Sequence, residues 1–235
     1  KIGQSVVVEN RPGAQTTIGT AQVARAKPDG YTMLYGSNSS LAAAPWLIKN
    51  LPYDPIKSFS AVAVTQDTSM ILVGKPADAQ YGFNGMVERM KKEPGMHALA
   101  GGALTQELIM ATLQKRAGTQ QPYVRYNSAQ VNNDVMGGRI AMAGNAMTGI
   151  SALVEEGKIH VFASTGLKRL PGKWSNIPTV AETYPGFNIT SWTGFWVPAG
   201  TPKPVINRLN ALVHEVQRDP ELIKRAETAG AQTLF

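Results

Sequence analysis

The chain has 235 residues, of which 43% are hydrophobic and 17% are charged, and its formal net charge is +7. This balance is typical of a globular protein and excludes an intrinsically disordered chain. The absence of cysteine excludes thiol catalysis, disulfides and cysteine-based zinc sites. No apolar run approaches the ~20 residues that a membrane-spanning helix needs, so we expect no such helix.

Lysine and arginine are scattered along the sequence. The tightest basic pairs are Lys91-Lys92 and Lys168-Arg169. Tracking of nucleic-acid phosphates needs a basic run or stripe, so we expect no nucleic-acid partner. We expect instead a surface that attracts anions in general.

The first part of the chain alternates between β-branched or aromatic runs, typical of strands, and helical segments. We predict strands at 4–9, 31–35, 60–65 and 69–73, and helices at 17–26 and 42–48. The continuous run Val6-Val7-Val8 favours a strand buried on both faces. Residues 36–40 form a predicted polar loop between the second strand and the second helix.

The alternation restarts after Lys75-Pro76. We predict helices at 82–92, 105–117, 131–136, 151–156 and 204–217, and strands at 97–100, 140–144, 160–164 and 195–198. Strands that alternate with helices indicate a mostly parallel sheet covered on both sides. Two such series predict an α/β protein of two lobes with a ligand cleft between them.

Motifs of common enzyme classes are absent. There is no Gly-x-Ser-x-Gly elbow, no Walker loop and no Gly-x-Gly-x-x-Gly fingerprint after a strand. His97, His160 and His214 lie far apart in sequence and lack the partners of a catalytic group. We therefore expect no catalytic residues, no cofactor and no metal site.

Six short motifs follow one another in a fixed order along the chain. They are VVVENRPGA (6–14), TIG (17–19), PDGYT (28–32), LPYDP (51–55), IPTVAE (177–182) and PAGTP (198–202). Together they resemble the substrate-binding proteins of tripartite tricarboxylate transporters, also called Bug or TctC-like receptors. Each motif alone is weak, but the resemblance covers essentially the whole chain.

The resemblance implies a two-lobed flytrap of the type II periplasmic-binding class. It would be a monomeric extracytoplasmic solute-binding protein in the periplasm that delivers a small organic carboxylate to membrane transporter subunits. Lobe I would comprise residues 1–74 and 190–235, and lobe II residues 75–189. Loops that open helices offer unpaired N–H donors to an anion, which suits such a ligand.

The sequence departs from the family in two places. Family members begin with another strand and a Pro-Pro-Gly-Gly-type loop before the segment with which this chain starts. We therefore expect part of lobe I and of the pocket to be missing from this sequence. We expect the sequence to be either a fragment or numbered from after unresolved residues. The family's second-lobe motif, Gly-x-Gly-Ser-x-x-His-Leu, is replaced at its hydroxyl by Leu104 and at its histidine by Glu107. We expect Glu107 to point away from the anion, because like charges repel.

The expected ligand-binding residues follow predicted strands. They are Ser37, Asn38, Ser39 and Ser40 in lobe I, and Gly101, Gly102, Ala103, Leu104, Thr105, Arg125, Tyr126 and Asn145 in lobe II. Plainer roles stay open: a helix cap for the serines, a tight turn for the glycines and a surface position for Arg125. An exposed guanidinium at Arg125 would suit a second carboxylate.

Two other functions also stay open. An enzyme on a related two-lobed scaffold would need a nucleophile–base pair, and a receptor that presents its ligand to a sensor kinase would use the same pocket. Because Leu104 replaces a hydroxyl, we expect a monocarboxylate, or an aromatic or aliphatic diacid, over a hydroxylated tricarboxylate.

Overall fold

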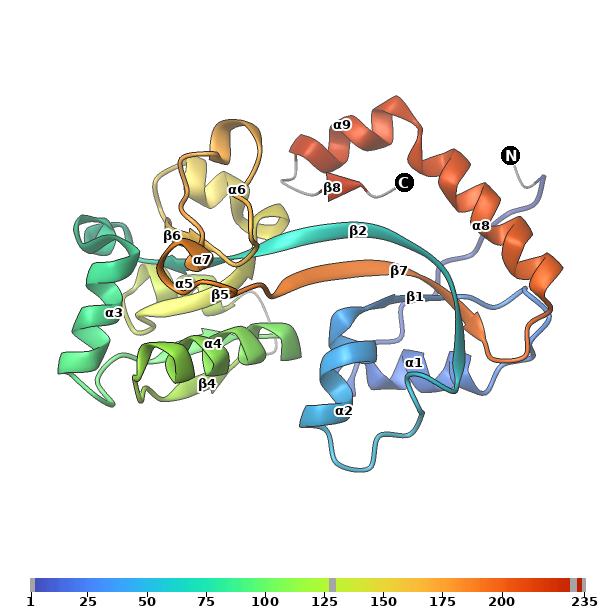
Figure 1. The fold of residues 1–235 in the computed structure, drawn as a ribbon, viewed down its shortest axis with the longest axis horizontal. Helices are drawn as coiled ribbons and strands as arrows, with labels where there is room; N and C mark the ends of the chain where they lie inside the picture. The colour runs from blue at the N-terminus through green and yellow to red at the C-terminus, as the bar shows by residue number, and fades with distance from the viewer. Residues whose placement is uncertain (1–2, 127–129, 229–231, 234–235) are drawn as a thin grey trace. The chain divides into compact units, whose positions relative to one another are not determined.

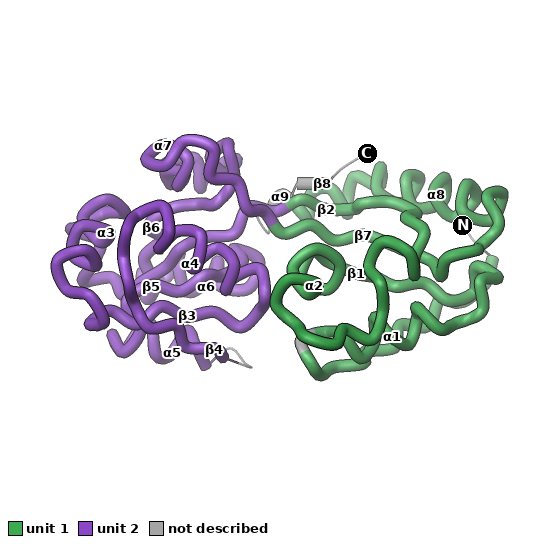
Figure 2. Tube along the Cα trace, turned by 60° about the horizontal axis from the view of Figure 1, so that its bottom comes forward, with its two compact units in different colours: residues 1–67, 191–228, 232–235 green, residues 68–190, 229–231 purple. Residues whose placement is uncertain are grey.

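The computed structural model describes residues 3–126, 130–228 and 232–233 (Figure 1). These residues form two compact units (Figure 2): unit 1 consists of 3–67, 191–228 and 232–233, and unit 2 of 68–126 and 130–190. The chain passes between the units inside strand β2 (Phe59–Gly74) and at the start of strand β7 (Thr190–Pro198). Residues 68–74, which the sequence-based division assigns to lobe I, belong to unit 2.

Unit 1 combines a small sheet with helices. Its elements are η1 (Ala14–Thr16), α1 (Thr17–Ala24), β1 (Leu34–Ser37), the π-helix η2 (Ser39–Ala43), α2 (Ala44–Leu47), α8 (Lys203–Gln217), α9 (Pro220–Thr228) and β8 (Gln232–Thr233), with the first part of β2 and most of β7. Strand β1 pairs antiparallel with β7, β7 lies beside β2, and β8 pairs antiparallel with β2. The buried core contains Ala21, Val23, Leu34, Tyr53, Phe59 and Trp196.

Helix α8 is held against β2 by side-chain amides. Asn210 Nδ2 donates to the carbonyl of Val62 at 2.7 Å, and Gln217 Nε2 donates to the carbonyl of Thr65 at 3.0 Å. Near the start of α8, a Cβ added to Gly30 would lie 2.3 Å from a methyl group of Val205. Because Gly30 also has a φ of +85°, this predicted turn needs glycine both for its conformation and for the close approach.

Unit 2 is a sheet covered by helices on both faces. Its elements are the rest of β2, η3 (Pro76–Tyr81), α3 (Gly82–Lys92), β3 (Leu99–Gly101), α4 (Leu104–Ala117), β4 (Tyr123–Arg125), α5 (Gln130–Met136), β5 (Met142–Ala146), α6 (Met147–Glu155), β6 (His160–Ser164), η4 (Gly172–Trp174) and α7 (Val180–Thr183). Met70 and Leu72 pack with α3 and α4, whereas the alternate residues Ile71 and Val73 pack with α5 and α6. The expected cover on both sides is therefore present in this unit.

The expectation of a mostly parallel sheet is wrong. Among the strand pairs of the described residues, only β3–β4 and β3–β5 are parallel, whereas β1–β7, β2–β5, β2–β6 and β2–β8 are antiparallel. The cause is β2, which the sequence divides into strands 60–65 and 69–73. In the structure it is one strand of 16 residues, and it runs antiparallel to these neighbours.

The strand predicted at 4–9 is also wrong. Val6, Val7 and Val8 are extended but carry no strand assignment, and their exposed fractions are 62%, 83% and 79%. A β-branched run becomes a strand only where a neighbour pairs with its backbone. No strand of the described residues pairs with this segment.

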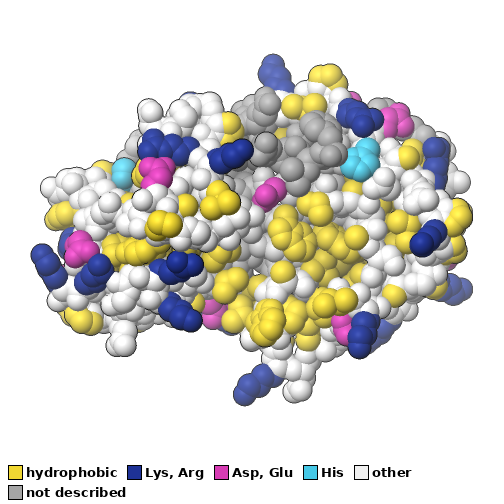
Figure 3. All heavy atoms as spheres, in the orientation of Figure 1, with side chains coloured by type: hydrophobic (Ala, Val, Ile, Leu, Met, Phe, Trp, Pro, Cys, Tyr) yellow, Lys and Arg dark blue, Asp and Glu magenta, His cyan; other side chains and the backbone are white. Residues whose placement is uncertain are grey.

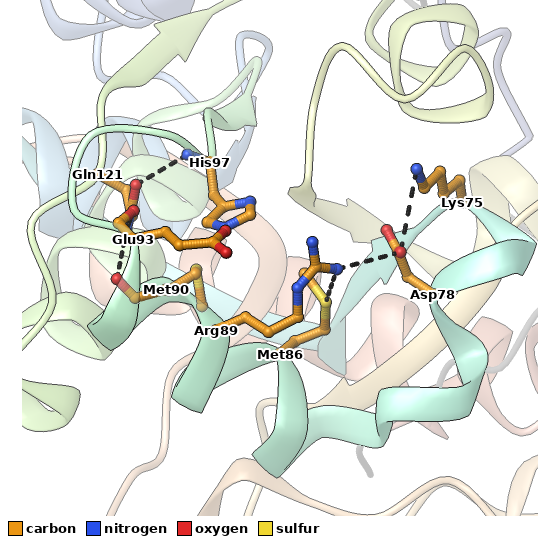
Figure 4. Close-up of polar contacts among 8 residues, drawn as sticks. All are labelled: Lys75, Asp78, Met86, Arg89, Met90, Glu93, His97 and Gln121. Carbon is orange, nitrogen blue, oxygen red and sulfur yellow. Dashed lines mark hydrogen bonds and ion pairs between the residues drawn. The ribbon is translucent and has the colours of Figure 1, made fainter.

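Charged residues connect η3 with α3, as Figure 4 shows. Asp78 is buried, and its carboxylate lies 3.4 Å from the guanidinium of Arg89 and 4.0 Å from the Lys75 ammonium. The Arg89 guanidinium also lies 4.5 Å from the centre of the Tyr81 ring. These contacts fix the first turn of η3 to the last turns of α3, so the cluster has a structural role.

The surface carries no large patch of a single charge on the face drawn in Figure 3, where acidic side chains lie among spaced lysines and arginines. This agrees with the scattered basic residues of the sequence. In the described part of the chain, no helix is long and apolar enough to cross a membrane.

Candidate functional site

The serine-rich segment of unit 1 joins β1 to η2 and is not the polar loop expected from the sequence. Ser37 is the last residue of β1, Asn38 already has helical dihedrals, and η2 begins at Ser39. The hydroxyl of Ser40 donates to the carbonyl of Ser37 at 3.1 Å and accepts from the N–H of Ser37 at 3.4 Å. Ser40 therefore closes the junction between strand and helix.

Other contacts hold this junction rigid. Asn38 Oδ1 accepts from the hydroxyl of Ser191 at 3.3 Å, and the hydroxyl of Tyr53 donates to the carbonyl of Ser40 at 2.7 Å. Burial raises the pKa of Tyr53, which keeps this donor neutral. The hydroxyl of Ser37, half-buried at the strand end, has no hydrogen-bond partner among the described residues.

In unit 2 the predicted turn lies between β3 and α4. Gly101 ends β3, Leu104 begins α4, and the side chains of Leu104 and Thr105 are 1% and 2% exposed. Any ligand contact from these two residues must therefore come from their backbone. The carbonyl of Gly101 accepts from the N–H of Tyr126 at 3.0 Å, which ties the turn to the end of β4.

The first turn of α4 carries a hydrogen bond that the sequence analysis did not anticipate. Gln106 Oε1 accepts from the N–H of Ala103 at 3.0 Å and also from the N–H of Gly102. A Cβ added to Gly101 would lie 2.6 Å from the Cβ of Gln106, and one added to Gly144 would lie 3.1 Å from it. Glycine at the end of β3 and in the middle of β5 thus makes room for Gln106.

Arg125 and Tyr126 are both engaged inside unit 2. Arg125 Nη2 forms an ion pair with Glu107 Oε2, so the chain supplies the carboxylate that we expected from a ligand. The hydroxyl of Tyr126 donates to Asp134, which also accepts from Arg139 Nε at 2.9 Å. These two bonds, that of Tyr126 first, lower the pKa of Asp134 and keep it ionised.

Asn145 lies in β5, and its side chain connects two helices. Its Nδ2 donates to Asn132 Oδ1 on α5 at 2.8 Å, and its Oδ1 accepts from the N–H of Ala146 at the start of α6. The half-buried Asn145 therefore has both ends of its amide bonded within unit 2. Its expected contact with a ligand stays a prediction.

The sequence of residues 1–234 matches the family described as the tripartite tricarboxylate transporter family receptor. The chain belongs to this family. It is 32% identical to a UPF0065 protein of Bordetella bronchiseptica, over 99% of this chain and 69% of that relative.

Solved structures of receptors support the same assignment. The periplasmic binding protein BugD is 33% identical, with a TM-score of 0.86 over 99% of this chain and 78% of BugD. An R. palustris protein whose structure was solved with adipate is 26% identical to this chain. Its TM-score is 0.90, and the match covers 99% of this chain and 79% of the R. palustris chain. The predicted two-lobed α/β fold of type II periplasmic-binding proteins is confirmed.

The histidines of this receptor have structural surroundings. His97 Nε2 lies 2.5 Å from a carboxylate oxygen of Glu93, and its backbone N–H donates to Gln121 (Figure 4). The ring of His160 packs edge-on against Phe162, and burial lowers its pKa. Within the described ranges no group of three or more His, Asp or Glu side chains is placed to hold a metal ion.

A cavity of about 360 Å³ lies at the C-terminal ends of α3 and α4. Met90, Lys91, Gln114 and Lys115 are among the residues that line it. None of the predicted ligand-binding residues does, so this cavity has no connection with the expected site.

Gln106, Asn132 and Ser191 were not predicted as partners of the candidate residues. For Gln106 a signal was present, because glutamine at the third residue of a helix often bonds back to the N–H groups that precede the helix. For Asn132 and Ser191 no local signal exists, since each meets its partner only through the tertiary fold.

Proposed function

We propose that this chain is an extracytoplasmic solute-binding protein that captures a small organic carboxylate in the periplasm. It delivers the ligand to the membrane subunits of a tripartite tricarboxylate-type transporter, acts as a monomer and performs no chemistry on the ligand. The observation that carries the proposal is membership of the receptor family over residues 1–234. Likeness to a structure solved with adipate, at 26% identity, supports a carboxylate as the ligand class.

In unit 1 we assign carboxylate binding to Ser37, Asn38, Ser39 and Ser40. The free hydroxyl of Ser37 supplies a donor at the end of β1. Ser40 supports it indirectly, because its hydroxyl fixes the backbone of Ser37. A net charge of +7 draws anions towards the protein before these short-range contacts form.

In unit 2 we assign ligand contacts to the turn 101–105 and to Arg125, Tyr126 and Asn145. Leu104 and Thr105 contribute only backbone groups, because their side chains are buried. The guanidinium of Arg125 is neutralised by Glu107. With no hydroxyl at Leu104, this part of the site favours a monocarboxylate, or an aromatic or aliphatic diacid, over a hydroxylated tricarboxylate.

Titration calorimetry with adipate, benzoate and citrate tests this function. We expect a saturable interaction with at least one of the first two acids and weaker binding of citrate. The recovered acid should be chemically unchanged after incubation. Binding of citrate about tenfold tighter than every aromatic and aliphatic acid would contradict the ligand class.

A further inference from the structure

The start of α4 is the part of unit 2 where an anion would be expected to bind, because helix N-termini present unpaired N–H groups. In this protein the N–H groups of Gly102 and Ala103 are already bonded to the side chain of Gln106. A ligand carboxylate would have to displace that side chain in order to reach them.

Chemistry fixes the orientation of the Gln106 amide. Two N–H donors require an acceptor, so the oxygen Oε1 faces Gly102 and Ala103, and the NH₂ group at Nε2 faces the other way. Nε2 has no hydrogen-bond partner among the described residues, and Gln106 is only half-buried. The side chain therefore presents an uncharged donor in place of two backbone N–H groups.

Strands β3 and β5 fix the position of the Gln106 side chain. Its Cβ lies against Gly101 at the end of β3 and against Gly144 in β5. A Cβ added at Gly101 would collide with it at 2.6 Å, and one added at Gly144 would crowd it at 3.1 Å. The anchored oxygen and the two glycines together restrict the amide to one place. A donor held in this way loses little conformational entropy when a ligand binds.

Among the described residues of unit 2, the ionisable side chains near Gln106 are either paired or neutral. Arg125 is paired with Glu107, the residue next to Gln106. The Tyr123 hydroxyl is buried, and its pKa is raised to about 12 by burial and by the nearby Glu107 carboxylate, so it is neutral as well. A second ligand carboxylate would find no cation here to balance its charge.

We propose that Gln106 is a ligand-binding residue that determines specificity: its Nε2 donates to an uncharged acceptor oxygen of the ligand. This inference rests on the proposed function and narrows its ligand class. The ligand is a monocarboxylate that carries a neutral oxygen, such as that of an amide or ketone, at the end opposite its carboxylate. A diacid of the same length is the disfavoured ligand.

The test is titration calorimetry with straight-chain diacids of increasing length, adipate among them, and with the monoamide of each. At the length that binds best, we expect the monoamide to bind about tenfold tighter than the diacid. Tighter binding of the diacid would overturn the inference and leave the proposed function standing. Failure of both series to bind, with failure of benzoate as well, would contradict the proposed function itself.

Two variants add a readout that a purely structural role would not give. Gln106→Glu keeps an oxygen that accepts from Gly102 and Ala103, but it replaces the NH₂ donor with a second oxygen. The affinity for the monoamide should therefore fall at least about tenfold, while Tm should be unchanged or higher. Gln106→Ala should also weaken the monoamide. Gln120→Glu, an exposed position beyond the far end of α4, is the control of equal charge. Wild-type monoamide affinity in Gln106→Glu, or tighter binding in Gln106→Ala, would show that Gln106 only fills the site.

Discussion

Arg125 on β4 forms an ion pair with Glu107 on α4, and the side chains are 46% and 26% exposed. The sequence presents Arg125 as a cation for a second ligand carboxylate. The structure gives that cation an internal carboxylate instead. Glu107, which stands where the family has a histidine, therefore controls whether the guanidinium is available.

Removing the charge of Glu107 should release Arg125. We expect Glu107→Gln to bind adipate about tenfold tighter than the wild type, because the guanidinium then lacks its internal partner. Calorimetry measures the change. Glu155→Gln, which removes the same charge from the exposed pair of Glu155 with Lys173, is the matched control and should leave adipate binding unchanged. An equal change in both variants would point to net charge alone.

The two serines at the ends of the β1–η2 junction should respond differently to substitution. Ser40→Ala removes a buried hydroxyl bonded to Ser37 and should lower the free energy of unfolding by about 1 kcal/mol. Ser37→Ala should leave stability nearly unchanged and weaken ligand binding by about 1 kcal/mol. Urea unfolding and calorimetry of both variants separate these effects. The assignment of Ser37 fails if its variant binds every acid as the wild type does.

Two glycine substitutions in unit 2 should have opposite effects on stability. In Gly101→Ala the new methyl group would lie 2.6 Å from the Cβ of Gln106 and 2.7 Å from the hydroxyl of Tyr123, so we expect a loss of about 1–3 kcal/mol of stability. In Gly149→Ala, on α6, the methyl group meets nothing within 4 Å. That variant should gain about 0.5–1 kcal/mol, because alanine favours helix. Thermal unfolding of both variants tests the contrast.

Acid should weaken one contact in a defined pH range. Hydrogen bonds from Arg169 first, and then from the backbone of Thr179, hold the pKa of Glu182 at about 2, below its ordinary value of 4.5. Because the pKa is lower in the folded state, this stabilisation is present above pH 4.5 and is lost as the pH falls towards 2. The stability advantage of the wild type over Glu182→Gln should therefore shrink across that range. An advantage that is constant with pH would disprove the link.

Local patterns predicted many elements well. Helix α3 and strand β6 have the bounds predicted from the sequence, since turn residues and regular apolar spacing mark both. The strand predicted at 4–9 failed because its pattern is satisfied only if another strand pairs with it. The sequence predicts two strands in place of β2, because the centre of β2 is polar. In the structure β2 is continuous, since it pairs with β8 in unit 1 and with β5 in unit 2.

The sequence proposes a candidate site as a set of positions, but it does not predict the contacts that these positions make in the structure. The predicted strands end at Tyr35 and Ala100, two residues and one residue before β1 and β3 end at Ser37 and Gly101. Gln106 bonds to Gly102 and Ala103 because its helix turn packs against Gly101 in β3 and Gly144 in β5. These two strands are far apart in sequence. Charge pairing between Arg125 and Glu107 likewise arises only in the folded chain.

Native mass spectrometry of protein purified without refolding tests the central claim most directly. If the chain is a carboxylate receptor, the spectrum should contain a fraction of protein with one added small mass, and denaturation should release that mass as an intact organic acid. Addition of the released acid to the stripped protein should restore the added mass at one equivalent. A spectrum of bare protein that stays bare across aliphatic, aromatic and hydroxylated acids would contradict the account.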